Sequence, residues 1–296
     1  MKNFLYIRKL QFYWRVKKLQ DEKNIVPNFL PFKLGYESDL GVFVQKKNEK
    51  VLESLKSIYK EEYNIGNIQA IGDWFHFYKK DFLDFIYFSV KSSSKKIKRI
   101  LEIGCGACTL LEALKKKGYN VVGIDPSVLS KREGRRKKVR VVVGFYPSKK
   151  IKGRFDLICH SDVLEHTSKP LSFLRRNFEQ LVDGGMVVLT VPDNTDSIAH
   201  GDISMLLHEH LSYFDKNSLR RILEAAGFSQ IRIRRAKFGG SLNASAKKIV
   251  RNRTRNHRYG DEDSYNEFLK KNQELVKKFT NYVEQIFKDK NRTLGF

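Results

Sequence analysis

The stretch that decides the fold is Arg99-Ile-Leu-Glu-Ile-Gly-Cys-Gly-Ala-Cys108, which runs into residues 109–117, where leucines recur at helical spacing. The mostly apolar residues before the glycines predict a buried strand. The glycines allow the backbone to turn sharply between that strand and the helix, and to approach a ligand closely. This stretch therefore predicts the first strand–helix unit of a ligand-binding α/β sheet.

Short apolar runs alternate with amphipathic stretches beyond this unit. Strands are predicted at residues 99–103, 120–125, 139–143, 155–160, 185–191 and 230–237, and helices at 109–117, 171–181 and 217–226. Alternation of strands and helices is typical of a parallel sheet that is covered by helices on both faces. We therefore expect an α/β fold for this part of the chain.

The second predicted strand ends at Asp125, in Val121-Val-Gly-Ile-Asp-Pro126. A carboxylate at this strand end can accept hydrogen bonds from both hydroxyls of a ribose. A dinucleotide site would have a third glycine to admit a pyrophosphate, but Cys108 stands there. The loop also opens with Glu102, an acid that repels phosphate and suits a cationic amino group. These residues indicate a ligand with a ribose and a positive charge.

This combination resembles the first motif of the class I S-adenosylmethionine-dependent methyltransferases, which have a Rossmann-like α/β sheet. The resemblance implies S-adenosyl-L-methionine as the cofactor, with Glu102 near its methionine moiety and Asp125 at its ribose. The residues expected to contact the cofactor are Glu102, Gly104, Cys105, Gly106, Asp125, Pro126, Ser161 and Asp162. Cys105 and Cys108 also form a C-x-x-C pair, but no second pair accompanies it for a metal site.

The candidate substrate motif is Leu207-His-Glu-His-Leu-Ser-Tyr-Phe214, which follows the fifth predicted strand. Histidine can accept a proton near neutral pH, and a neighbouring carboxylate can orient it. We expect His210, supported by Glu209, to be the general base, with His208 beside it. A zinc site is the alternative, and its candidate ligands are His200, Asp202, His208 and His210. A polar helix cap without chemistry is a further alternative, and no metal is assigned.

The same motif, followed by Gly227-Phe228 and Gly239-Gly-Ser-Leu242, resembles the sugar C-methyltransferases of deoxysugar and surface-glycan pathways. Gly144-Phe-Tyr-Pro147 fits this resemblance too. It implies a sugar acceptor that is surrounded by Glu209, His210 and Tyr63.

Two features depart from that family. Leu207 stands where the family has a tyrosine, and no cysteine precedes Cys105 to bind the family's zinc. Both O-methylation and C-methylation of the sugar therefore stay open.

The resemblance and the periodicity divide the chain into three parts. Residues 1–95 are predicted to be a helical and basic region that forms part of the substrate site, with helices at 51–59 and 69–90. Residues 96–248 are the predicted cofactor-binding domain. Residues 249–296 are a basic segment followed by an amphipathic helix at 265–288. Residues 1–19, aromatic and basic, are compatible with an amphipathic helix on an anionic membrane surface.

The formal net charge is +24, and most of it lies in four tracts, residues 1–24, 91–99, 131–154 and 247–258. Such tracts suit a polyanionic partner, either RNA, anionic lipid or a phosphate-bearing substrate, or they form a solvated surface. Three functions follow: methylation of a small molecule, foremost a sugar; methylation of RNA; and a non-catalytic cofactor-binding module. We expect the small molecule and no specific nucleic acid.

The remaining features concern location and assembly. The sequence has three cysteines and no stretch of 18 apolar residues, so we expect a cytoplasmic protein, in contact with the membrane at most peripherally. The resembled family continues into a second α/β lobe after its long helix. We therefore expect a shortened chain, whose residues after Lys288 are poorly ordered or pair with another subunit, as in a homodimer.

Overall fold

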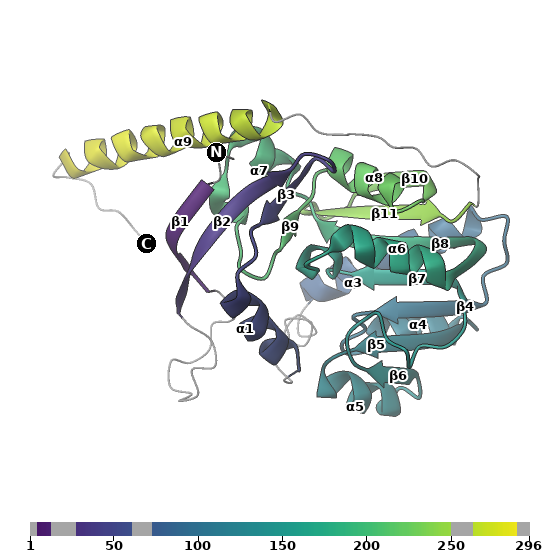
Figure 1. Ribbon diagram of the computed structural model, residues 1–296. Coiled ribbons are helices and arrows are strands. Elements are labelled where there is room, and N and C mark those ends of the chain that lie inside the picture. The colour runs from purple at the N-terminus through teal and green to yellow at the C-terminus, as the bar shows by residue number, and fades with distance from the viewer. Residues whose placement is uncertain (1–4, 13–27, 61–72, 250–262, 289–296) are drawn as a thin grey trace.

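A computed structural model describes residues 5–12, 28–60, 73–249 and 263–288 (Figure 1). The larger of its two sheets has seven strands in the order β10-β11-β8-β7-β4-β5-β6. These are β4 (Arg99–Ile103), β5 (Asn120–Asp125), β6 (Arg140–Val143), β7 (Phe155–Ser161), β8 (Leu181–Pro192), β10 (Ser229–Arg235) and β11 (Ser241–Lys247). The five strands from β8 to β6 are parallel, while β11 is antiparallel to both β8 and β10. The predicted α/β Rossmann-like fold is confirmed.

Helices cover both faces of this sheet. They are α3 (Asp73–Lys91), α4 (Thr109–Lys116), α5 (Val128–Arg136), α6 (Pro170–Gln180) and α8 (Lys216–Ala225). Ile100 of β4 packs in one core with Phe82 of α3 and Leu111 of α4, while its neighbour Leu101 packs in the other core with Leu174 of α6. Successive strand residues point to opposite faces, so a run of apolar residues serves two cores.

The strand order reverses between β4 and β7. The chain runs outward from β4 through β5 to β6 and then returns to form β7 and β8 on the other side of β4. Open α/β sheets bind ligands at the carboxyl ends of the strands at such a reversal. The topology thus points to the loops that follow β4 and β7.

A second, antiparallel sheet has the order β1-β2-β3-β9 and lies beside the larger one (Figure 1). It contains β1 (Leu5–Gln11), β2 (Phe29–Glu37), β3 (Val42–Gln45) and β9 (Ser212–Tyr213). The helix expected over residues 1–19 is therefore wrong for Leu5–Gln11. In β2 every second residue, Leu30, Phe32 and Leu34, is buried, which is the period of a half-buried strand. Residues Leu5–Gln11 pair with β2 and so form a strand, although their own sequence does not show a strand pattern.

The helices predicted in the N-terminal region are present alongside this sheet. Helix α1 (Glu49–Lys60) confirms the prediction for residues 51–59. Helix α3 confirms the prediction for 69–90 from Asp73 onward, while residues 69–72 lie outside the described part. The described part of residues 1–95 is therefore a mixed α/β region where a helical one was expected.

Helix α9 (Asp263–Lys288) runs along one side of the smaller sheet (Figure 1). The Tyr265 hydroxyl accepts a hydrogen bond from the backbone N–H of Leu5 and donates one to the carbonyl of Leu34, at 2.9 and 2.8 Å. The structure does not describe the side chains of the predicted apolar stripe, Phe279, Val283 and Phe287. All residues after Lys288 also lie outside the described part of the chain. None of the described helices is long and apolar enough to cross a membrane.

Candidate active site

A cavity of about 440 Å³ opens at the reversal of strand order. Its lining has two groups of residues. The first group comes from the loops after β4, β5 and β7 and includes Glu102, Gly104, Cys105, Gly106, Asp125, Pro126, Ser161 and Asp162. The second group is aromatic and titratable and includes Tyr59, Tyr78, Glu165, His166, Glu209 and His210.

The glycine loop between β4 and α4 leaves space for a ligand. Gly104 has φ +74°, and a Cβ there would come within 2.6 Å of Val163. A Cβ on Gly106, at φ +43°, would meet nothing within 4 Å. Cys108 has φ +57°, a left-handed conformation that favours glycine. Cys108 is fully buried and is not among the residues that line the cavity, so its side chain lies away from the ligand side of the loop.

Asp125 at the end of β5 holds this loop in place. One carboxylate oxygen accepts the backbone N–H of Gly106 at 2.9 Å, and the other accepts the backbone N–H and hydroxyl of Ser127. Burial raises the pKa of Asp125, while these hydrogen bonds lower it. The carboxylate is thus fixed at the cavity wall before any ligand arrives.

Glu102 lies beneath the loop and is only 2% exposed. Its Oε2 has no hydrogen-bond partner among the described residues, and burial raises its pKa to about 8. A buried carboxylate with one unsatisfied oxygen fits a cationic group, since a positive charge would offset the cost of ionising it. Together with Asp125, these residues fit the ribose and the amino group of S-adenosylmethionine.

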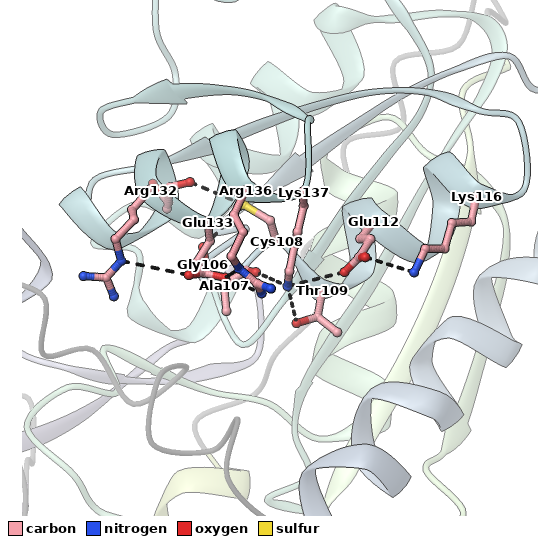
Figure 2. A network of polar contacts seen from close by, with 11 residues as sticks. Gly106, Ala107, Cys108, Thr109, Glu112, Lys116, Arg132, Glu133, Arg136 and Lys137 are labelled. Atoms are coloured by element: carbon pink, nitrogen blue, oxygen red, sulfur yellow. Dashed lines mark hydrogen bonds and ion pairs between the residues drawn. The ribbon is translucent and has the colours of Figure 1, made fainter.

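Lys137, just after α5, supports the loop from outside the cavity (Figure 2). Its side chain is 8% exposed, and its ammonium group donates to the carbonyl of Ala107 at 2.6 Å and to the hydroxyl of Thr109 at 3.3 Å. Glu112 of α4 lies 3.6 Å away and also pairs with Lys116. This lysine belongs to the basic tract 131–154, so part of that charge serves the loop.

The second group gathers around the short helix η1 (Leu164–His166). His166 contacts the backbone carbonyl of Glu209 through Nδ1 at 2.8 Å and the hydroxyl of Tyr59 at 3.2 Å. The rings of His166 and His210 lie 5.1 Å apart, edge to face. Burial raises the pKa of Glu209, whereas burial, with His166 nearby, lowers the pKa of His210 to about 3.

Tyr78 of α3 completes the cavity wall beside Asp162. Its hydroxyl donates to the carboxylate of Asp162 and lies 3.2 Å from the hydroxyl of Ser161. Burial and the nearby Asp162 carboxylate raise the pKa of Tyr78. The phenol is therefore a neutral hydrogen-bonding group at physiological pH.

The structure brings Glu209 and His210 into the cavity but not His208. The His208 ring stacks on Phe12 at 5.3 Å, and its nitrogens contact the carbonyl of Leu10 and the side chain of Gln45. The catalytic prediction for His208 is therefore corrected: it holds the smaller sheet together. The zinc set built on His208 is not assembled either, and Tyr63 lies outside the described residues.

The sequence analysis did not assign several of the cavity residues to the site, among them Tyr59, Tyr78, Glu165 and His166. Tyr78 belongs to an aromatic helical stripe, whose other members Phe82, Phe85 and Ile86 are core residues. Glu165 and His166 belong to the short helix η1, which follows β7. Their only signal was a position after a strand's carboxyl end, which is where such sheets bind ligands.

Residues 74–233, more than half of the chain, match the family described as a methyltransferase domain. The chain belongs to this methyltransferase family. Its domain is that of a class I S-adenosylmethionine-dependent methyltransferase, as the sequence predicted.

Curated relatives cover only part of the methyltransferase. A ubiquinone biosynthesis O-methyltransferase of Pseudomonas aeruginosa (strain UCBPP-PA14) is 31% identical over 101 residues, which are 31% of this chain and 44% of that protein. The enzyme of the same name from Nitrobacter winogradskyi is 31% identical over 113 residues, 36% of this chain and 43% of that protein. The chain thus spans less than half the length of these relatives.

A solved structure described as PigF with SAH shares the fold of the methyltransferase. Its TM-score is 0.52 at 18% identity, covering 66% of this chain and 62% of that chain. The comparisons support methyl transfer and leave the sugar acceptor as a proposal.

Cofactor binding by the methyltransferase is expected to release a proton from Glu102. A pKa of about 8 leaves this carboxyl mostly protonated at pH 7, and the amino group of the cofactor favours its ionised form. Affinity should therefore rise as pH increases from about 6 to 7, by up to tenfold per unit. Calorimetry in buffers of different ionisation enthalpy should find about one proton released at pH 7.

The stability of the cofactor-free protein should change in the opposite sense. Because the folded-state pKa of Glu102 lies above its unfolded value, the folded chain binds more protons between about pH 4.5 and 8, and stability falls as pH rises through that window. The control for the proton release is the Glu102→Gln variant, which should release no proton when it binds the cofactor. Equal release from the variant and the wild type would mean that another group ionises.

Replacing Lys137 by methionine is expected to weaken cofactor binding about tenfold or more. The change removes a charge-assisted hydrogen bond to the Ala107 carbonyl, and such bonds contribute roughly 1.5–3 kcal/mol. Lys116→Met is the matched control, because Lys116 pairs with the same Glu112 but is exposed. Calorimetry should find the control within twofold of the wild type. A Lys137→Met affinity equally close would show that the loop holds its shape without the lysine.

Proposed function

We propose that this methyltransferase transfers the methyl group of S-adenosylmethionine to a hydroxyl oxygen of a small-molecule acceptor. The observation that carries the proposal is that Glu209 lines the same cavity as the cofactor loop. A hydroxyl acceptor must lose a proton as it is methylated, and a carboxylate of raised pKa can accept it. The name O-methyltransferase of the curated relatives supports oxygen as the acceptor atom.

Glu209 is favoured over His210 as the proton acceptor. A pKa of about 3 makes the buried His210 ring a weak base at neutral pH. Burial has the opposite effect on Glu209, since it destabilises the carboxylate and so makes it a stronger base. We therefore transfer to Glu209 the role that the sequence analysis gave to His210.

The other residues of the cavity would bind and orient the two reactants. The bound cofactor supplies an electrophilic methyl group. Asp125 and the glycine loop would hold its ribose, and Glu102 its amino group. Tyr78, fixed by its hydrogen bond to Asp162, would orient the acceptor, and so would Tyr59 of α1. Alignment of the hydroxyl with the methyl group is the main requirement of such a transfer.

Two hydroxyl acceptors stand out. A sugar, as the sequence motifs imply, offers several hydroxyl donors, for which Asp162, Glu165 and Glu209 are acceptors. An aromatic hydroxyl, as the relatives' name suggests, would pack against Tyr59 and Tyr78. Both acceptors are small, which fits a cavity of about 440 Å³ shared with the cofactor.

Several basic side chains bind groups within the protein itself, which favours a small-molecule acceptor over RNA. Besides Lys137, Lys248 donates to the carbonyl of Leu181, and its side chain is 8% exposed. The Arg99 guanidinium donates to the carbonyl of Lys152 and lies over the ring of Phe155. These residues come from three of the basic tracts, and each donates to a carbonyl group of the protein. The high net charge is therefore weaker support for a polyanionic partner than the sequence suggests.

The test is methyl transfer from isotope-labelled S-adenosylmethionine to a panel of nucleotide sugars, quinols and RNA. The proposal expects a labelled O-methyl product from a sugar or a quinol, identified by mass spectrometry. A labelled carbon position or labelled RNA would overturn it. Binding of S-adenosylhomocysteine without any product across the panel would favour a non-catalytic module.

A further inference from the structure

Glu165 is a buried carboxylate in the wall of the cavity. Its side chain is 1% exposed, and neither oxygen has a partner among the described residues. It lines the cavity with two further carboxylates, Asp162 and Glu209. An ionised carboxylate in such surroundings requires a compensating positive charge, because burial removes its stabilisation by water.

His166 presents a lone pair to this carboxylate. Its Nδ1 lies 2.8 Å from the carbonyl oxygen of Glu209 and 3.2 Å from the hydroxyl of Tyr59. The carbonyl oxygen only accepts hydrogen bonds, so this shorter contact assigns the proton of a neutral ring to Nδ1. The other nitrogen, Nε2, is then unprotonated and lies 3.7 Å from Oε1 of Glu165. With a neutral ring and an ionised carboxylate, two electron-rich atoms face each other, which is unfavourable unless a proton or a metal cation lies between them.

His210 adds a second imidazole to the pair. Each of Glu165, His166 and His210 offers one ligand atom, and these atoms all lie within 4.8 Å of one another. Ligand atoms on one ion are about 3–3.5 Å apart when the bonds are about 2.1 Å long. Side-chain shifts of about 1 Å would complete the coordination.

We propose that Glu165, His166 and His210 bind a divalent transition-metal ion. Two imidazoles and one carboxylate suit Zn²⁺, Mn²⁺, Fe²⁺ or Co²⁺ better than Ca²⁺ or Mg²⁺, which prefer oxygen ligands throughout. The Glu209 carbonyl is the outer partner that fixes the tautomer of a metal-binding histidine. Three protein ligands leave coordination positions open to the cavity.

The inference rests on the proposed function only in assigning the open positions to the acceptor. A hydroxyl bound to the ion is more acidic than a free one, so Glu209 beside it would remove its proton more readily. The site thereby favours acceptors whose reacting oxygen can coordinate a metal.

The experiment uses Co²⁺ as the probe, added to the full chain after treatment with EDTA and gel filtration. Calorimetry should find one ion per chain, and visible absorption should show the bands of Co²⁺ bound by nitrogen and oxygen ligands. Glu165→Gln and His210→Ala should each weaken binding at least about tenfold. The matched control is His200→Ala, which removes an exposed histidine of α7 (Thr195–His200) and should leave binding unchanged.

Binding of S-adenosylhomocysteine to the same samples shows whether each variant is folded, and His166→Ala replaces any variant that is not. Absence of a stoichiometric Co²⁺ site, or binding that survives Glu165→Gln and His210→Ala, would overturn the metal site. In the first case a proton shared by Glu165 and His166 would supply the missing charge. A protein that binds Co²⁺ as expected but methylates no hydroxyl would overturn the proposed function alone.

Discussion

Replacing Glu209 by glutamine is expected to lower the turnover number about 10²- to 10⁴-fold, the usual contribution of a general base. The substitution keeps the size of the side chain and removes its ability to accept a proton at neutral pH. It also leaves the cofactor loop and the three proposed metal ligands unchanged. Steady-state kinetics should therefore show the loss in turnover, while calorimetry finds the affinity for S-adenosylhomocysteine within twofold of the wild type.

The control for this experiment is Glu224→Gln, which neutralises an exposed glutamate of α8. Its turnover should match that of the wild type. If Glu209→Gln retained full turnover and His210→Ala lost it without losing Co²⁺, the base would be His210, as first expected from the sequence. Full turnover in both variants would remove the pair from catalysis.

Replacing Asp125 by alanine is expected to weaken cofactor binding at least about tenfold. The variant loses charge-assisted hydrogen bonds to the ribose, each worth roughly 1.5–3 kcal/mol, and releases the loop at Gly106. Calorimetric titration with S-adenosylhomocysteine measures the effect. Asp125→Asn, which keeps an acceptor oxygen, should lose less.

Asp156→Ala is the matched control for Asp125. Its carboxylate also accepts two backbone N–H groups, those of Lys98 and Arg99, but at the opposite end of the sheet. This control should lower the melting temperature without changing cofactor affinity. Normal affinity in Asp125→Ala would place the ribose elsewhere in the cavity.

The cofactor half of the site was predictable because its chemistry is local in sequence. Glu102, the glycines and Asp125 each end a strand or follow one, and strand periodicity alone puts them at the same sheet edge. The smaller sheet was missed for the opposite reason. Leu5–Gln11 is mixed apolar and basic, and only its pairing with β2 makes it a strand.

The acceptor half depends on long-range contacts that no local pattern contains. Tyr59 and His166 meet across 107 positions, through segments that pack only in the complete fold. His208 and His210 are two residues apart in one motif, yet a turn directs the first ring into the smaller sheet and the second into the cavity. Residue types predicted that this motif lies at the site, but the course of the backbone determines which histidine lines the cavity.

Strand β9 has a consequence for how such a protein can be recombined. This strand follows directly after the segment that carries Glu209 and His210. Its two residues pair with Phe43 and Val44 of β3. A cut at the expected domain boundary near residue 95 would therefore remove the neighbour strand of that segment, together with helix α3, which packs against β4 and α4 beside the cofactor loop. Chimeras that exchange the N-terminal region between relatives should keep their cofactor affinity, but they should inherit a new acceptor preference only when the segment before β9 is exchanged with it.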